Sequence, residues 1–439
     1  MKMDDLGRRL EKENINVIHA GQFDYGSVFR ERRLNREQFL AWARDPRFAN
    51  VLAFWDCSDS LFGSGPYLSE PVGIDEGSLR PYAFEPNAAA IITDFTGPSA
   101  PLMPRTVLKA QIDRAAAMGF DVTAAFEFEV VMLTESAASL RANDFAPPGQ
   151  FAPDNKCWSG QTAADHAGFV AELEAGIKAH GVSLFSLAGE LGPGCFEATL
   201  GAVPALRAAD DACFFRTATR SIARSKGLTA SFMPYLGAAY PAIGGHVHLS
   251  LTSKASGKNV FSDPGRTTNE TAKHFIAGMT KVVPQAFALC AHTVNAYRRF
   301  APGSWAPKCV SWDEWTFTTA VRSVPSDNDS ARLEFRLPGA DCNPHLSLAL
   351  LLGAGLDGLE QKLSAPERAP AGGPDDIPPG AIRLPRDLAE AAGRLRESAD
   401  AKTLFGAAFV EHFAKVCDIE HTSLIRAVSN VELKRYLEG

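Results

Sequence analysis

The sequence predicts an α+β protein with a small N-terminal domain and a large C-terminal domain. Short runs rich in β-branched and aromatic residues, typical of buried strands, alternate with stretches whose apolar residues have helical spacing. With 439 residues, the chain is long enough for one enzyme-sized domain and a smaller one. The turn-forming run Pro98–Pro101 interrupts the pattern, so we predict domains over residues 1–102 and 103–439.

The first domain begins with a charged helical segment and continues with runs of strand character. We expect these strands over Ile15–His19, Val51–Asp56 and Ala88–Phe95. The second domain begins with an amphipathic helix over Arg105–Gly119.

The end of the second domain is predicted to be helical. We expect helices over Leu388–Ser398, Thr403–Val416 and Asn430–Leu437. The segment Ala365–Pro385, rich in proline and glycine, is predicted to be a surface loop between helices.

Composition and charge exclude several classes of protein. The net charge is −7 and no block of lysine and arginine is long enough for a nucleic-acid or membrane surface. The polar N-terminus lacks the apolar run of a secretory signal, and no run approaches membrane-spanning length. Eight scattered cysteines without a C-x-x-C pair indicate reduced thiols. We therefore expect a cytoplasmic protein without nucleic-acid or membrane partners.

The segment Ala125–Leu133 reads as a buried strand that carries two carboxylates. Side chains alternate along a strand, so Glu127 and Glu129 point to the same face, about 7 Å apart. Burying even one unpaired carboxylate costs several kcal/mol. The strand can carry both carboxylates if cations lie between them or if this face is exposed to water. Exposure to water is the ordinary interpretation of an isolated E-x-E pattern.

The same kind of pattern recurs three times downstream. First, Glu190 and Glu197 flank a Gly-Pro-Gly turn. Second, the predicted strand Gly244–Leu251 places His246, His248 and Ser250 on one face. Third, the predicted strand Ala331–Leu337 places Arg332, Glu334 and Arg336 on one face. Alone, an H-x-H pattern is often a surface strand and an R-x-E-x-R pattern a salt-bridge ladder. Together, the five glutamates and at least one histidine favour Mg²⁺ or Mn²⁺ over zinc. Two such ions flanked by arginines suit phosphoryl transfer.

These segments resemble the glutamine synthetase superfamily, and they occur in its order along nearly the whole chain. Further matching segments are Asp75–Arg80, Asn295–Pro307, Asn343–Leu346 and Val431–Tyr436. The resemblance implies a β-grasp-like N-terminal domain and an open-barrel catalytic domain. It also implies active sites shared between adjacent subunits of a homo-oligomer, with hexameric rings stacked as a dodecamer.

The resemblance assigns metal ligands and further site residues. It places one metal on Glu129, Glu190 and Glu197, and another, which orients the ATP phosphates, on Glu127, His246 and Glu334. Two to three Mg²⁺ or Mn²⁺ ions per site and ATP as co-substrate are expected. The resemblance also implies that Arg299 and Arg336 bind the substrate carboxylates and that Arg322 binds phosphate. It implies nucleotide binding by His248, Ser250, Arg322 and Arg332. Asp56 is expected to contribute to the neighbouring subunit's amine site.

The chain departs from the family pattern at positions that concern the substrates. Trp305 stands where ammonia-using enzymes carry a glutamate that binds ammonium and takes its proton. Phe317 stands in place of a phosphate-contacting arginine, and Ala242–Ile243 replaces a Gly-Ser pair that contacts the amino-acid substrate. Cys195 and Tyr235 replace a usual glutamine and a usual lysine. Trp305 and Phe317 are the predicted amine pocket.

The sequence therefore predicts an ATP-dependent carboxylate–amine ligase of the γ-glutamylamide type. It is similar to the γ-glutamyl-polyamine and γ-glutamylamide synthetases, which form an amide through an acyl phosphate and use an organic amine rather than ammonia. Three alternatives remain open at this point. They are a true glutamine synthetase, a catalytically retired structural or regulatory member of the fold, and a kinase that phosphorylates a guanidine or an amine.

Overall fold

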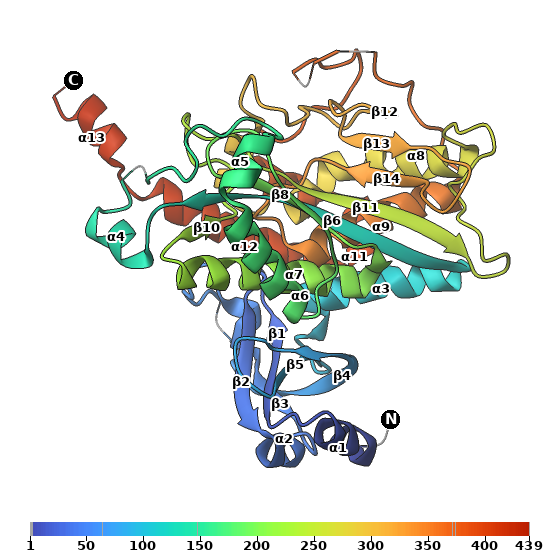
Figure 1. Cartoon of the computed structure of the whole chain (residues 1–439). Coiled ribbons are helices and arrows are strands. Elements are labelled where there is room, and N and C mark those ends of the chain that lie inside the picture. The colour runs from blue at the N-terminus through green and yellow to red at the C-terminus, as the bar shows by residue number, and fades with distance from the viewer. Residues whose placement is uncertain (1–2, 64, 147, 371, 374, 439) are drawn as a thin grey trace.

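The computed structural model describes residues 3–63, 65–146, 148–370, 372–373 and 375–438. Within these ranges the strands form two sheets, one of five strands near the N-terminus and one of nine strands in the rest of the chain. Figure 1 shows the N-terminal sheet projecting from one side of a larger body, whose curled sheet is backed by long helices. The α+β prediction is confirmed.

The N-terminal sheet has the strand order β2-β1-β5-β4-β3. Its strands are β1 (Val17–Phe23), β2 (Phe29–Asn35), β3 (Arg47–Ala49), β4 (Ser69–Pro81) and β5 (Ala88–Phe95), accompanied by helices α1 (Met3–Lys12) and α2 (Arg36–Trp42). β1 pairs with β5 in parallel and with β2 in antiparallel orientation. The strand predicted over Ala88–Phe95 is confirmed with the same bounds.

The strand predicted over Val51–Asp56 is wrong. This segment lies largely in a 3₁₀ helix, η1 (Asn50–Phe54), whose Leu52 and Ala53 pack into a small core with Phe48. A short apolar run cannot be assigned to strand or helix by periodicity alone. The side chain of Asn50 connects the start of this helix to the chain around residue 69, since its Nδ2 donates to Glu70 Oε1 at 2.8 Å and its Oδ1 accepts from Leu68 N at 2.7 Å.

The large sheet has the main strand order β12-β13-β14-β11-β6-β8-β7, and β9 and β10 also pair with β6. The pairs are antiparallel except β12 with β13. The strands are β6 (Phe120–Leu133), β7 (Leu184–Gly189), β8 (Cys195–Leu200), β9 (Val203–Pro204), β10 (Thr229–Ser231), β11 (Gly245–Ser253), β12 (Trp312–Glu314), β13 (Val321–Val324) and β14 (Arg332–Phe335). The three strands predicted around Glu127, His246 and Glu334 are therefore confirmed.

Helices cover one face of the large sheet (Figure 1). The long ones are α3 (Pro104–Ala117), α6 (Ala167–Ala179), α7 (Ala205–Ser225), α8 (Glu270–Ala286), α9 (Pro344–Gln361) and α12 (Ala407–Ile425). The shorter ones are α4 (Ala137–Ala142), α5 (Gly160–Asp165), α10 (Leu388–Glu397), α11 (Ala399–Phe405) and α13 (Asn430–Tyr436), with 3₁₀ helices η2 (Ala100–Leu102), η3 (Phe287–Leu289) and η4 (Asn295–Phe300).

Most of the predicted helices are confirmed, and one is divided. The predicted helix Thr403–Val416 breaks at Gly406, whose φ of 89° lies in a region that glycine adopts readily, so α11 ends and α12 begins there. The described residues of Ala365–Pro385 contain no helix or extended strand, as a loop requires. Within the described ranges, no helix combines the length and the apolar character needed to span a bilayer.

The apolar face of β6 anchors the sheet to the helices. Phe126 and Phe128 are fully buried and stack with their ring centroids 5.7 Å apart, and Phe128 lies 5.8 Å from Phe215 of α7. Because side chains alternate along a strand, Glu127 and Glu129 point away from the helices. The opposite face of the sheet is therefore free to carry polar groups.

A buried arginine near residue 102 joins the N-terminal sheet to helices α3 and α7 of the larger body. Arg105, in the first turn of α3, donates to Asp94 Oδ2 and Asp75 Oδ2, both at 2.6 Å, and to Asp210 of α7 at 2.9 Å. Asp75 and Asp94 belong to β4 and β5 of the N-terminal sheet. The domain division itself, at residues 102 and 103, stays a prediction.

Candidate active site

The charged residues of the large sheet are brought together by strand register. In the pairing of β6 with β11, His246 lies opposite Glu127, and in the pairing of β11 with β14, His248 lies opposite Glu334. Glu334 in turn lies opposite Arg322 of β13. Directly opposed residues project to the same face of a sheet, so these side chains form a continuous polar stripe across four strands.

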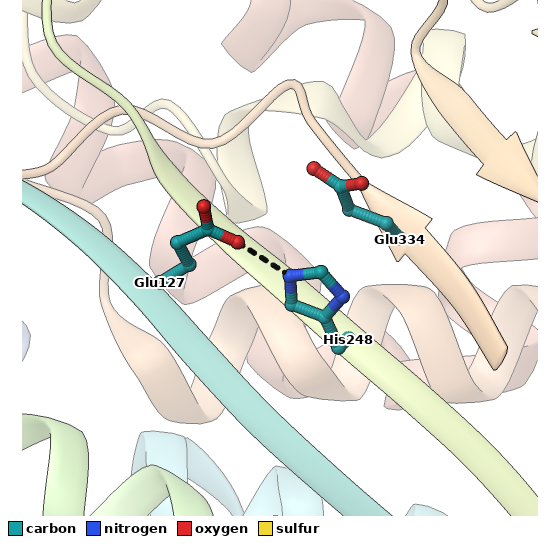
Figure 2. Close-up of side chains that lie close together, drawn as sticks. All are labelled: Glu127, His248 and Glu334. Carbon is teal, nitrogen blue, oxygen red and sulfur yellow. Dashed lines mark hydrogen bonds and ion pairs between the residues drawn. The ribbon is translucent and has the colours of Figure 1, made fainter. Parts of the chain in front are cut away.

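Three residues of this stripe form a compact group of possible metal ligands. In Figure 2, Glu127, His248 and Glu334 point toward one another from three adjacent strands. Each offers one ligand atom, and these atoms all lie within 4.8 Å of one another. His248 Nε2 is 2.8 Å from Glu127 Oε2.

The sequence assigned His246 rather than His248 to this group. In the structure His246 is buried, and its Nδ1 lies 3.6 Å from Glu334 Oε1 without a hydrogen-bond partner among the described residues. Both histidines therefore neighbour Glu334, but the group that closes around Glu127 contains His248. The H-x-H spacing predicts a shared face and cannot choose between the two rings.

Glu334 is held by arginines on both sides. Its Oε2 accepts from Arg322 Nη1 at 2.8 Å and its Oε1 from Arg336 Nη1, while only 1% of its side chain is exposed. Burial alone would raise the pKa of Glu334, but Arg336 and the nearby histidines lower it to about 2. The carboxylate is therefore ionised at neutral pH.

The other carboxylates of the site crowd one another. Glu129 and Glu197 are opposite each other on β6 and β8, and Glu197 shares a hydrogen bond with Glu127. Burial and the charge of Glu127 raise the pKa of Glu197 to about 9. Burial, reinforced by the charge of Glu190, raises the pKa of Glu129 to about 7, although Gly244 N donates to it at 2.9 Å.

This donor set fits a hard divalent cation. Clustered carboxylate oxygens with imidazole nitrogens are ligands that Mg²⁺ or Mn²⁺ accepts. A cation would relieve the repulsion that raises the pKa values of Glu129 and Glu197, and the buried Nδ1 of His246 has no partner in the described part of the chain. The assignment of each ligand to one metal stays a prediction.

Glu190 is positioned by residues that the sequence did not single out. It follows β7, and it accepts from Cys157 Sγ at 3.0 Å, from Trp158 Nε1 at 3.0 Å and from Leu191 N at 2.9 Å. Cys157 and Trp158 come from the segment before α5, more than thirty residues earlier in the chain. No spacing rule connects segments this distant, so only the tertiary structure reveals the contact.

Arg299 lies beneath the stripe. It comes from η4 and is 4% exposed, and its Nη1 donates to Leu337 O at 3.0 Å while its Nη2 lies 3.5 Å from His246 Nε2. Its Nε has no hydrogen-bond partner among the described residues, and burial lowers the pKa of Arg299 to about 10. A cation of this kind, beside Arg336 and within reach of the metal-ligand group, is suited to a substrate carboxylate.

The nucleotide-binding candidates extend the stripe toward the end of β11. Arg332 Nε lies 3.3 Å from His248 Nδ1, so the arginine orients the ring that faces Glu127. Ser250 is two residues further along β11, opposite Thr123 of β6, and is half-buried. Their roles toward a nucleotide stay predictions.

Comparison with known proteins identifies the family. The family model described as glutamine synthetase, catalytic domain, matches residues 101–436. The chain belongs to the glutamine synthetase family. The model covers well over half of the chain, and membership through the catalytic domain makes the chain an ATP-dependent ligase that forms carbon–nitrogen bonds.

The similar proteins include both an amine ligase and a glutamine synthetase. A glutamate–isopropylamine ligase of a Pseudomonas species is 33% identical over 446 residues, covering 98% of this chain and 96% of that protein. A type-1 glutamine synthetase of Dictyostelium discoideum is 31% identical over 431 residues, covering 94% and 82%. A solved structure of GmaS without ligand superposes with a TM-score of 0.85 at 25% identity, covering 99% of this chain and all of that one. The predicted glutamine synthetase-type fold is thereby confirmed.

The two predicted amine-pocket residues of this glutamine synthetase family member lie in different surroundings. Phe317 is 53% exposed, and its ring carries the guanidinium of Arg322 at 4.2 Å and that of Arg336 at 5.5 Å from its centroid. Trp305 is 60% exposed and stacks on no ring of the described residues. Phe317 thus covers the two arginines that hold Glu334, whereas Trp305 leaves an open indole face.

The segment Ala242–Ile243 and Asp56 complete the account of the predicted site. Ile243 is fully buried and its N donates to Pro234 O at 2.9 Å, so its side chain does not line an open space. Asp56 follows η1, and its Oδ1 accepts from Ser58 N at 2.8 Å and from Ser60 N at 2.9 Å. Among the described residues of one chain it has no hydrogen bond or ion pair with the sheet stripe, so its role at a neighbouring site stays a prediction.

Proposed function

We propose that this enzyme joins the γ-carboxyl group of glutamate to a small alkylamine in an ATP-dependent reaction. Overall identity does not choose between ammonia and an amine, since a glutamine synthetase and an isopropylamine ligase are similarly related. The observation that carries the proposal is Trp305, an exposed indole where the ammonia-using pattern has a carboxylate. An indole neither holds an ammonium ion through charge pairing nor accepts its proton.

The exposed area of Trp305 sets the size of the expected preference for an alkylamine over ammonia. A tryptophan side chain presents up to roughly 250 Å², and 60% of this residue is exposed. A small alkyl group that covers roughly 50 Å² of the open indole gains about 1.3 kcal/mol, or about tenfold, from apolar burial. Ammonia has no alkyl group and gains none of this.

The arginines of the stripe match the charges that such a reaction must handle. Arg299 and Arg336 would bind the carboxylates of the acid, while Arg322 and Arg332 would face the phosphates. The acid oxygen attacks the terminal phosphorus of ATP, ADP leaves, and an acyl phosphate forms. The amine nitrogen then attacks the acyl carbon, the carbon–oxygen bond to phosphate breaks, and the nitrogen's proton passes to phosphate as it leaves.

Divalent cations complete this arrangement. We place two to three Mg²⁺ or Mn²⁺ ions on the crowded carboxylates and the stripe histidines, where they would neutralise charge on the phosphate oxygens. The predicted ligands are Glu127, Glu129, Glu190, Glu197, Glu334 and His246, with His248 added by the geometry.

We also propose a cytoplasmic homo-oligomer built from hexameric rings stacked as a dodecamer. The C-terminal segment supports an oligomer, because α13 extends away from the body (Figure 1) and the chain from the end of α12 to the residue after α13 bears exposed apolar side chains. Ile425, Val428, Val431 and Leu437 are each between 68% and 76% exposed, which is unusual for a monomer in water. The eight cysteines, all within the described residues, are free, as a reducing compartment requires.

Release of ADP with panels of acids and amines tests the proposed reaction. We expect isopropylamine or a similar alkylamine, with glutamate, to exceed ammonia at least tenfold in kcat/KM. Trp305→Glu should reduce that ratio about tenfold, and Trp305→Phe, which keeps an apolar ring, should retain most of it. Equal use of ammonia by the wild type would contradict the proposal.

A second candidate, a catalytically retired member of the fold, is favoured by Phe317 alone. Its ring covers Arg322 and Arg336, where the family pattern has an additional arginine. The same assay separates the two, because a retired protein releases no ADP with any acid and amine at saturating Mg²⁺.

A further inference from the structure

Trp305 is not held in place by hydrogen bonds of its own. Its side chain is 60% exposed, and among the described residues neither its backbone nor its indole makes a hydrogen bond. It lies in the loop 301–308, which begins directly after η4 and contains no helix or strand. The position of the indole is therefore set by what its neighbours in this loop bind.

One residue from a distant loop binds the chain on both sides of Trp305. Asp375 Oδ2 accepts from Gly303 N at 2.8 Å, and its Oδ1 lies 3.4 Å from Lys308 Nζ. Lys308 Nζ in turn donates to Ala301 O at 2.8 Å, which closes the loop on itself. Asp375 is thus linked to a residue two positions before the indole and to another three positions after it.

The segment that carries Asp375 is attached to the large sheet at both ends. Near its start, Pro366 O accepts from the indole Nε1 of Trp312, the first residue of β12, at 2.8 Å. Near its end, Leu384 N donates to Lys308 O at 3.3 Å. Both loops therefore lie beside β12, which ends the strand order of this sheet (Figure 1).

The hydrogen bond to Gly303 is the stronger of the two links. A backbone N–H that donates to a carboxylate forms a charge-assisted bond, whereas the ion pair with Lys308 is partly exposed and exposed pairs contribute little. The amide of Gly303, more than Lys308, holds the pKa of Asp375 below its usual value. Gly303 has a φ of 80°, and glycine can leave such a conformation at little cost. Its bond to Asp375 therefore restricts the backbone that leads into Trp305.

We propose that Asp375 is a positioning residue for amine selection, which holds the loop 301–308 so that the indole of Trp305 faces the amine. The inference rests on the proposed function, because it concerns the residue that would select a small alkylamine. Asp375 acts through Trp305 alone, so its loss should affect the use of the amine and not that of ATP or glutamate. The segment Ala365–Pro385, predicted from the sequence as a surface loop, thereby contributes to the choice of substrate.

Hydrogen exchange of the full chain without substrates, read by mass spectrometry on peptides that cover residues 301–308, tests the contact itself. We expect Asp375→Ala to increase exchange at the Gly303 amide about tenfold, since a hydrogen bond to a charged group is lost. Asp375→Asn, whose side-chain carbonyl still accepts from Gly303 N, should retain most of the protection. Asp376→Ala is the matched control, because Asp376 Oδ2 accepts from Gly373 N at 2.8 Å within its own loop. Equal exchange of Gly303 in the wild type and in Asp375→Ala would overturn the proposal.

Steady-state kinetics with glutamate, ATP and isopropylamine test the role in substrate choice. Asp375→Ala should raise the KM for isopropylamine about fivefold, within the roughly tenfold that the whole indole contact supplies. The kcat and the KM values for glutamate and ATP should change less than about twofold, and Asp375→Asn should have nearly the wild-type KM for the amine. In a Trp305→Ala background, Asp375→Ala should have no further effect, because no indole is left to position. A rise that persists in that background, or an equal rise in the KM for glutamate, would overturn the proposal.

The two experiments separate failure of this inference from failure of the proposed function. Equal use of ammonia and isopropylamine by the wild type would contradict the proposed function, whereas the exchange of Gly303 needs no substrate and still decides whether Asp375 holds the loop. A wild type that prefers isopropylamine, with an unchanged KM for it in Asp375→Ala, would support the proposed function and overturn this inference.

Discussion

Glu334→Gln should destabilise the protein, because this carboxylate neutralises two guanidinium groups. The side chain is 1% exposed and accepts from Arg322 and Arg336, whose side chains are 16% and 10% exposed. A glutamine keeps the shape but leaves both cations without a countercharge. Removing one partner of a buried ion pair costs about 3–5 kcal/mol, and we expect a loss of that size in the free energy of unfolding.

Glu129→Gln should have the opposite effect on stability without metal. Burial and the charge of Glu190 oppose ionisation of Glu129, as its pKa of about 7 shows. Removing the charge relieves this repulsion, so the variant should be at least as stable as the wild type at pH 8. Both variants should lose ATP turnover, because both residues are predicted metal ligands.

Urea denaturation followed by circular dichroism, in EDTA at pH 8 and equal protein concentration, measures the two effects. The wild type and a Glu270→Gln variant, altered at an exposed glutamate of α8, serve as controls. The reasoning fails if Glu334→Gln unfolds at the wild-type midpoint, or if Glu129→Gln is destabilised by a similar amount.

Three further predictions concern Glu197, Arg105 and Asp56. The pKa of Glu197 is raised from 4.5 to about 9, so its contribution to stability is complete below about pH 4.5 and is lost as pH rises through about 9. Thermal scans should therefore show that Mg²⁺ stabilises the protein more at pH 8 than at pH 6. Greater stabilisation at pH 6 would contradict this. Arg105→Ala should lower the free energy of unfolding by about 3–5 kcal/mol, because buried Asp210 loses its cation; chemical denaturation at the wild-type midpoint would argue against it. Mixing inactive Asp56 and Glu334 variants under subunit exchange should restore some activity if Asp56 acts in a neighbouring site; an active monomer on light scattering would exclude this.

The sequence by itself determined the strands that carry the site and the direction of their side chains. A period of two places Glu127 and Glu129 on one face and Phe126 and Phe128 on the other, and the structure shows this arrangement. The apolar run around Ile91 and Ile92 likewise predicted the strand Ala88–Phe95 with its bounds. Such features depend on backbone geometry within a few residues, which the order of amino acids specifies directly.

Local rules failed where a segment's structure depends on contacts further along the chain. The apolar run Val51–Asp56 has the composition of a strand, yet the side-chain hydrogen bonds of Asn50 to Glu70 and Leu68 stabilise a 3₁₀ helix there. Gly406, similarly, ends one helix and begins another inside a continuous helical pattern.

Only the tertiary structure decided which side chains meet across the site. Strand register places His246 opposite Glu127 and His248 opposite Glu334, whereas side-chain conformation brings His248 to Glu127 and His246 toward Glu334. The contact of Cys157 with Glu190 spans 33 residues, and Arg216 of α7 donates to Ala340 O and Cys342 O, which lie 124 and 126 residues later in the chain. These arrangements require distant segments to pack together, and residue spacing along the chain contains no measure of that packing.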